Sequence, residues 1–265
     1  MRFTLGVILS LFFLSGSAYA VDLSASFWQI KKSTHFIVYY QEAPSDYINE
    51  VIERSEGYYN TITTKLGFTR YEEFWTWYKR AKIYLFRNKE EYTRITSQPE
   101  WSRAHSRVID HEVYTYVRRD GFFEAVLPHE LGHIIFREFI GYDKRLPLWI
   151  DEGVATFCER GGTQEGVRMT RVISRTVFFM EIPEMGEVNR ANLMMPEIFY
   201  AEAESVMEFL INAYGSDKFA EFCLALKNLK EEQTWEDAIR SVYKFNNVQE
   251  MNEAWMKHLA SYKPS

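Results

Sequence analysis

The sequence predicts an α+β fold, with a mixed sheet and helices in its N-terminal half and helices alone in its C-terminal half. Three observations support this prediction. Short β-branched and aromatic segments are confined to the part of the chain before about residue 120. A helical segment that carries two histidines follows, from about Phe122 or Pro128 to Ile140. After Gly162, apolar residues recur at helical spacing in short-looped succession.

The first twenty residues have the pattern of a secretory signal. Arg2 is a short basic start, residues 5–14 form an apolar core, and Ala18-Tyr19-Ala20 is a small-residue cleavage site. An uncleaved anchor is the alternative, but a membrane span needs about 20 apolar residues and this run is roughly half as long. No later stretch is long and apolar enough to span a membrane. We therefore expect cleavage near Ala20 and an exported chain, either periplasmic or secreted.

Composition restricts the class of protein further. Residues 21–265 are enough for one large domain or two small ones that share a core, and no repeat or low-complexity linker marks a boundary within them. Aromatic residues make up 17% of the chain, so the core should be dense in Phe, Tyr and Trp. The formal charge is −6 and no basic cluster stands out, which argues against nucleic-acid binding.

Strands and helices alternate in the β-rich half, which extends to about residue 141. Segments with β-branched and aromatic residues predict strands, and apolar residues at a spacing of three and four predict helices. We expect strands at residues 35–40, 82–86 and 107–118 and helices at residues 44–67 and 89–95.

The central motif is Leu-Pro-His-Glu-Leu-Gly-His at residues 127–133. His129 and His133 are four residues apart, so a helix places both imidazoles on one face, where they can reach one ion. Glu130 lies at the edge of the same face and can accept a proton from a water that the ion activates. This is the H-E-x-x-H arrangement of zinc hydrolases. The helix should begin near Phe122 or at Pro128 and end before Gly141.

A metal held by two histidines needs a third ligand and an open position. Glu152 is the candidate, with eighteen residues between it and His133. Two neutral imidazoles and one carboxylate leave one Zn²⁺ with a net positive charge, which lowers the pKa of a bound water toward ~7. A second helix begins near Asp151, and Glu152 lies at its start. For Asp151 we expect no role beyond a favourable charge at the start of this helix. Glu159 lies further along that helix and either accepts the free N–H of a ligand histidine or is solvated.

This pattern resembles the gluzincin clan of zinc metallopeptidases. Within the clan, the His-Glu-x-x-His motif and the later Asp-Glu-Gly-Val-Ala segment are most similar to the peptidase-MA-like proteins, which are related to the catalytic domain of aminopeptidase N. The resemblance implies a zincin-like fold. It also implies that Tyr200, near the start of a later helix, donates its hydroxyl to the oxyanion of the reaction. The strand before the metal helix would be the sheet edge along which substrate lies, or would be covered by protein.

One departure concerns the kind of peptidase. The Gly-x-Met-x-Asn motif with which aminopeptidase N relatives hold the free amine of a substrate is absent. The resemblance therefore favours an endopeptidase over an aminopeptidase. The substrate would be a peptide or a protein.

The C-terminal half should close the site from the other side. We expect helices at residues 169–179, 200–214, 219–229, 235–242 and 248–259. Cys158 and Cys223 lie on predicted helices, and they form either a disulfide or two buried thiols.

These observations predict an exported zinc metallopeptidase in which Glu130 is the general base and Tyr200 stabilises the oxyanion. The alternative is an exported zinc-binding scaffold with residual or no peptidase activity. Zinc-dependent hydrolysis of a non-peptide bond is a third hypothesis.

Overall fold

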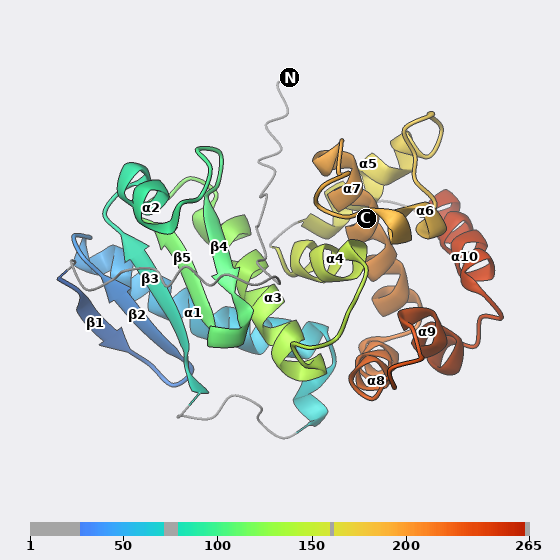
Figure 1. The fold of residues 1–265 in the computed structure, drawn as a ribbon, viewed down its shortest axis with the longest axis horizontal. Helices are drawn as coiled ribbons and strands as arrows, with labels where there is room; N and C mark the ends of the chain where they lie inside the picture. Colours follow the sequence, from blue (N-terminus) through green and yellow to red (C-terminus); the bar gives the residue numbers. More distant parts are fainter. Residues whose placement is uncertain (1–26, 72–78, 160–161, 263–265) are drawn as a thin grey trace.

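The computed structural model describes residues 27–71, 79–159 and 162–262. The predicted signal segment lies outside these ranges. In Figure 1 the sheet and the helices that cover it lie on the left, and the later helices lie on the right. Helices α3 and α4 lie between these two parts. Among the described residues, no helix has the length and apolar character needed to cross a bilayer.

A five-stranded mixed sheet forms the N-terminal part, as the sequence predicts. Its order is β1-β2-β3-β5-β4; the β2–β3 and β3–β5 pairs are parallel and the two outer pairs are antiparallel. The strands are β1 (Gln29–Lys32), β2 (Phe36–Tyr40), β3 (Ala81–Phe86), β4 (Ala104–Arg107) and β5 (Glu112–Tyr116). Of these, β1 was not predicted, and β4 shares only Arg107 with a predicted strand.

The single strand predicted at residues 107–118 is wrong. A 3₁₀ turn at Val108–Asp110 separates β4 from β5, and His111 takes a left-handed backbone conformation with φ 54°. No Gly or Pro marks this turn, so the sequence alternates through it without a break. As a result β5, the last strand before the metal helix, is internal, and β4 forms the sheet edge instead.

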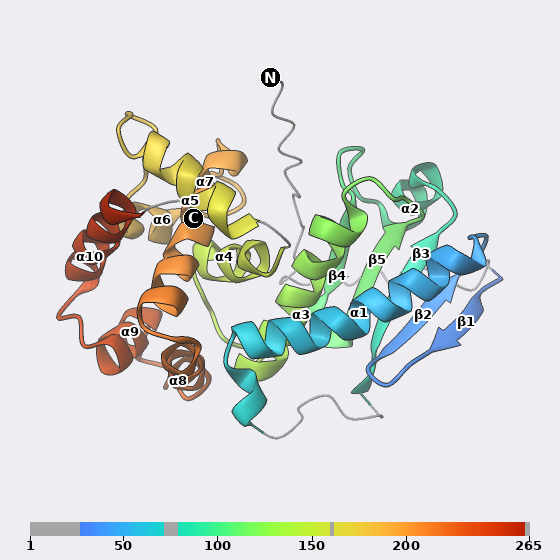
Figure 2. The ribbon, with the colours of Figure 1, turned by 180° about the vertical axis from the view of Figure 1, so that it is seen from behind.

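The two faces of the sheet are covered differently. Helices α1 (Ser45–Lys65) and α3 (Leu127–Ile140) pack against one face of the sheet and form the main core with it. Figure 2 shows α1 running along the sheet to α3. A smaller aromatic cluster lies with α2 (Lys89–Thr96) on the other face. Four rings stack there across neighbouring strands with centroids 4.7–4.9 Å apart, from Tyr39 through Tyr84 and Tyr114 to His105. These cross-strand pairs stabilise this face of the sheet, while most of the expected buried aromatic residues lie in the main core.

The C-terminal part is helical, as predicted. It consists of α4 (Leu148–Cys158), α5 (Gly162–Ile173), α6 (Ile182–Glu187), α7 (Pro196–Glu208), α8 (Ser216–Lys227), α9 (Trp235–Tyr243) and α10 (Val248–Ser261). The helix expected at residues 169–179 begins and ends earlier, and α6 was not predicted. Helix α7 packs closely on α4, where a Cβ added to Gly153 would lie 2.7 Å from the carbonyl oxygen of Ala203. The absence of a side chain at this glycine lets the two helices approach.

Candidate metal centre

The helix that carries the two histidines begins in an unusual way. Residues Phe122–Val126 form a π-helical turn that runs directly into α3, so the chain is helical on both sides of Pro128. Proline has no N–H to donate, and within α3 it lies in the first turn, where that loss costs little. The sequence left two helix starts open, near Phe122 and at Pro128. The π-helical turn begins at Phe122, and α3 begins at Leu127, next to Pro128.

An ion pair between Arg137 and Asp151 joins α3 to α4. Arg137 Nε donates to Asp151 Oδ1 at 2.7 Å, and Arg137 Nη2 contacts the other carboxylate oxygen. Arg137 also donates to the carbonyl of Lys144. Arg137 is 1% exposed, so the expectation that Asp151 serves only a helix start is incomplete. The pair holds His133, one turn before Arg137, and Glu152, next to Asp151, on helices that are locked together.

Gly132 lies at the crossing of the same two helices. A Cβ at this position would come within 3.2 Å of the backbone of Ala155 and the side chain of Cys158. Tight packing of α3 on α4 therefore requires the small residue at this point.

Three side chains from α3 and α4 converge at the centre of the protein. The Nε2 atoms of His129 and His133 lie 3.2 Å apart, and Glu152 Oε2 lies 3.6 Å from each of them. The three residues form a possible metal-binding group and are at most 1% exposed. The sequence spacing thus identified three groups that the fold brings together.

The separations of these atoms fit a single cation. Donor atoms at roughly 2.1 Å from a tetrahedral ion are separated by about 3.4 Å, and the observed separations lie on either side of that value. Within the described part of the chain, Glu152 Oε2 accepts no hydrogen bond. A buried carboxylate oxygen aimed at two imidazoles is therefore a fit for a divalent metal.

Glu159 supports the first histidine from behind. Its Oε1 lies 2.8 Å from His129 Nδ1, the ring nitrogen that faces away from the other candidate ligands. The prediction that Glu159 lies on the same helix as Glu152 is wrong, because α4 ends at Cys158 and Glu159 has an extended backbone. Burial on its own lowers the pKa of His129, but hydrogen bonds to the carboxylates of Glu152 and Glu159 outweigh it and raise the pKa to about 10. The same negative field favours a bound cation.

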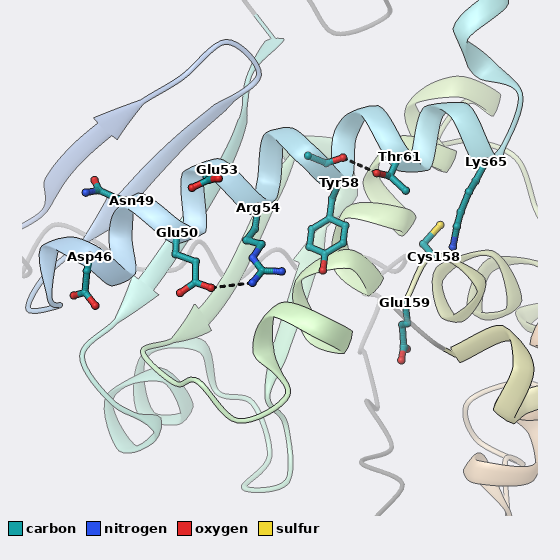
Figure 3. A pocket seen from close by; sticks show the side chains of 11 residues that line it. Asp46, Asn49, Glu50, Glu53, Arg54, Tyr58, Thr61, Lys65, Cys158 and Glu159 are labelled. Atoms are coloured by element: carbon teal, nitrogen blue, oxygen red, sulfur yellow. Dashed lines mark hydrogen bonds and ion pairs between the residues drawn. The ribbon is translucent and has the colours of Figure 1, made fainter.

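A groove of about 990 Å³ runs along α1 and ends at Glu159. Figure 3 shows Glu159 and Cys158 at one end of this groove, with Asp46 and Asn49 at the other. The three candidate ligands do not line it. The groove therefore ends at the carboxylate that contacts His129 and not at the candidate ligands themselves.

Two further predicted residues lie beside the centre. Glu130 follows His129 on α3 and is fully buried. Tyr200 lies near the start of α7, and its buried hydroxyl makes no hydrogen bond to any described residue. Burial, and then the charges of Glu152 and Glu130 against the opposing charge of Arg190, raise the pKa of Tyr200 above its usual value. The phenol stays protonated and can donate a hydrogen bond.

Sequence reasoning missed Arg190. Its Nη2 donates to Glu152 Oε1 at 2.8 Å, so the two oxygens of this carboxylate face different partners. Arg190 lies in the loop between α6 and α7, thirty-eight residues after Glu152. No local pattern around it distinguishes it from a surface arginine.

The two cysteines are free thiols, and both are buried. This decides between the two alternatives left open by the sequence. Burial raises the pKa of the Cys158 thiol to about 12, so it remains neutral near the metal helices.

The fold and the centre together define a zincin-like α+β protein, with a His-Glu-x-x-His helix and a third acidic group on the next helix. The family described as the Peptidase MA superfamily matches residues 119–261, which is more than half of the chain, and the chain belongs to this superfamily. This confirms the resemblance to the gluzincin peptidases and supports a metallopeptidase-like function. No curated protein shows a significant match to the chain.

Proposed function

We propose that the protein is an exported zinc-dependent metallopeptidase that hydrolyses peptide bonds. The observation that carries this proposal is the convergence of His129, His133 and Glu152 on one point, with Glu130 beside them. Two nitrogens and one oxygen form a donor set that suits Zn²⁺ and leaves a fourth position open. When bound, the ion polarises the scissile carbonyl and lowers the pKa of water.

Glu130 is the proposed general base. It accepts a proton from the attacking water and delivers it to the nitrogen of the leaving amine. Its place next to His129 on α3 brings its carboxylate to the face that carries the ligands, and its complete burial keeps it away from bulk water. A protein that used zinc only for structure would have no need of this carboxylate, which favours the enzyme over the scaffold.

Tyr200 is the proposed donor to the oxyanion. Its hydroxyl is buried and protonated, and it makes no hydrogen bond to a described residue that would have to be broken first. A donor that is already in place costs no reorganisation during the reaction, and such a group contributes about 3 kcal/mol to catalysis.

The edge strand of the sheet supports a peptide substrate. Within the described part of the chain, β4 pairs with β5 on one side and with no strand on the other. Backbone hydrogen bonds to an edge hold an extended peptide whatever its side chains are. An extended peptide can continue beyond both ends of an edge strand, so this arrangement favours internal cleavage. This agrees with the absence of the motif that holds a free amine.

The place of action follows from the first twenty residues. A signal cleaved near Ala20 would deliver the chain to the periplasm or the exterior. N-terminal sequencing of the protein recovered from the cell envelope and from the medium tests this: a chain that begins at Val21 supports export, and an intact Met1 contradicts it.

The peptidase proposal is tested with a library of internally quenched peptides whose two ends are blocked. We expect internal cleavage that a chelator abolishes and that added Zn²⁺ restores. Glu130→Gln should bind one zinc per chain and lose activity by several orders of magnitude. The matched control is Glu124→Gln, the same change at an exposed position in the preceding π-helical turn. Zinc binding without cleavage of any peptide, blocked or unblocked, would favour the scaffold.

A further inference from the structure

Arg190 occupies a defined place in a surface loop. The loop joins α6 to α7, and its residue Met194 is 88% exposed. Two asparagines shape the turn around Arg190. The Asn189 N–H donates to Asn192 Oδ1 at 2.6 Å, and Asn189 Oδ1 accepts from the Ala191 N–H at 2.9 Å. Asn192 Nδ2 also donates to the carbonyl of Glu187. This network fixes the backbone that directs Arg190 inward.

The guanidinium divides the carboxylate of Glu152 between two partners. Arg190 Nη2 binds Oε1 at 2.8 Å, while Oε2 faces the two histidine nitrogens at 3.6 Å. Carboxylates can bind a cation with one oxygen or with two. Here the arginine engages one oxygen, which leaves the other as the one directed at the metal.

We propose that Arg190 is a positioning residue for the metal centre, which holds Glu152 so that this ligand offers a single oxygen and the ion retains an open coordination position. The inference rests on the proposed metal site and adds the loop between α6 and α7 to it. In this role the arginine acts through Glu152.

Charge and burial support this role. Glu152 is wholly buried, whereas the Arg190 side chain is 28% exposed, so the guanidinium reaches the carboxylate from the solvent side. A hydrogen bond to a charged donor fixes the carboxylate plane more firmly than a neutral donor would. Groups that orient a metal ligand in this way usually change metal affinity about 10–100-fold when they are removed.

The test uses the mature chain loaded with Co²⁺, whose visible absorption is most intense with four ligands, weaker with five and weakest with six. Arg190→Met removes the charge and the donors, and Arg190→Lys keeps the charge with one donor group. The matched control is Arg168→Met, the same change on α5, where the side chain is 47% exposed.

We expect the absorption per bound cobalt to fall in R190M, because Glu152 is free to bind with both oxygens. Cobalt affinity, measured by competition with a chromophoric chelator, should fall about ten-fold. R190K should recover part of both quantities, and R168M should match the unchanged protein. An R190M spectrum identical to that of the unchanged protein overturns the inference, whatever its affinity.

A second variant keeps the test valid if R190M does not fold. Asn192→Ala loosens the turn but leaves the guanidinium in place, and it should reduce the absorption in the same direction by a smaller amount. If the spectra of N192A and R190K are both identical to that of the unchanged protein, the inference is overturned. These outcomes differ from failure of the proposed metal site, in which the unchanged protein itself would bind no cobalt, and from failure of the proposed peptidase, in which the unchanged protein would bind the metal and cleave no peptide.

Discussion

Arg137 and Asp151 form a buried, two-point ion pair that joins the helix of the two histidines to the helix of Glu152. Neither residue is a proposed ligand, but Asp151 is next to Glu152 and Arg137 lies one helical turn after His133. The pair fixes how α3 and α4 lie against each other, and this determines whether a carboxylate on one helix reaches two imidazoles on the other.

Removal of one member of this pair should strongly destabilise the fold. Arg137→Met leaves the Asp151 carboxylate buried without its partner, and such a change costs about 3–5 kcal/mol of unfolding free energy. Urea unfolding measures it. The matched control is Arg87→Met, which breaks an exposed pair with Glu42 and should cost less than about 1 kcal/mol. The double variant R137M/D151L should recover much of the loss. Equal losses in R137M and R87M would argue against the structural role.

Tyr200 gives a prediction that separates catalysis from stability. Tyr200→Phe removes a buried hydroxyl that bonds to no described residue, so the free energy of unfolding should not fall. The kcat should fall about 10²–10³-fold if this hydroxyl donates to the oxyanion. Tyr243→Phe is the control, because Tyr243 has the same 6% exposure and a buried hydroxyl that likewise lacks a described partner. Equal activity in Y200F and Y243F would remove Tyr200 from the mechanism.

Loss of the Glu159 charge should weaken metal binding, whereas loss of the Glu53 charge in the same groove should not. Glu159→Gln retains an oxygen acceptor for His129 Nδ1 but removes the negative charge, and we expect the zinc dissociation constant to rise about 10-fold. Competition with a chelator of known affinity measures it. Glu53→Gln makes the same change on the α1 wall of the same groove, far from the histidine, and should have no effect. The same affinity in both variants would mean that Glu159 does not support the ligand.

Glu202 on α7 predicts a dependence of stability on pH. Burial, opposed by a hydrogen bond from the Met180 N–H and aided by Glu184, raises the pKa of this carboxyl to about 8 from an ordinary value of 4.5. Between these values the folded state holds a proton that the unfolded state releases, so stability falls as the pH rises.

Glu202→Gln mimics the protonated form and removes this cost. Its melting temperature should match that of the unchanged protein at about pH 5 and exceed it at about pH 9. A difference in melting temperature that is the same at both pH values would show that Glu202 does not titrate in this range.

The three candidate metal ligands could be brought together from the sequence because their geometry is mostly local. Two histidines four residues apart share a helix face in any helix, and a glutamate at a fixed distance along a helix pair narrows the choice of third ligand. The helical half was predicted for the same reason, since apolar spacing depends on each helix alone.

The residues that hold the ligands could not be predicted in this way. Arg137 and Arg190 pair with acids fourteen and thirty-eight residues away, and these pairs depend on how helices cross and where a loop folds back. From spacing alone, a buried arginine on a helix is indistinguishable from a solvated one. The turn between β4 and β5 was missed because a histidine at positive φ replaces the usual glycine.

Zinc K-edge X-ray absorption of the purified protein tests the central claim most directly, because it counts and identifies the atoms bound to the metal. We predict one zinc per chain with nitrogen and oxygen donors alone at about 2.0–2.2 Å, two of them imidazoles. A sulfur donor at about 2.3 Å, or a His133→Ala variant that retains the same spectrum, would contradict it.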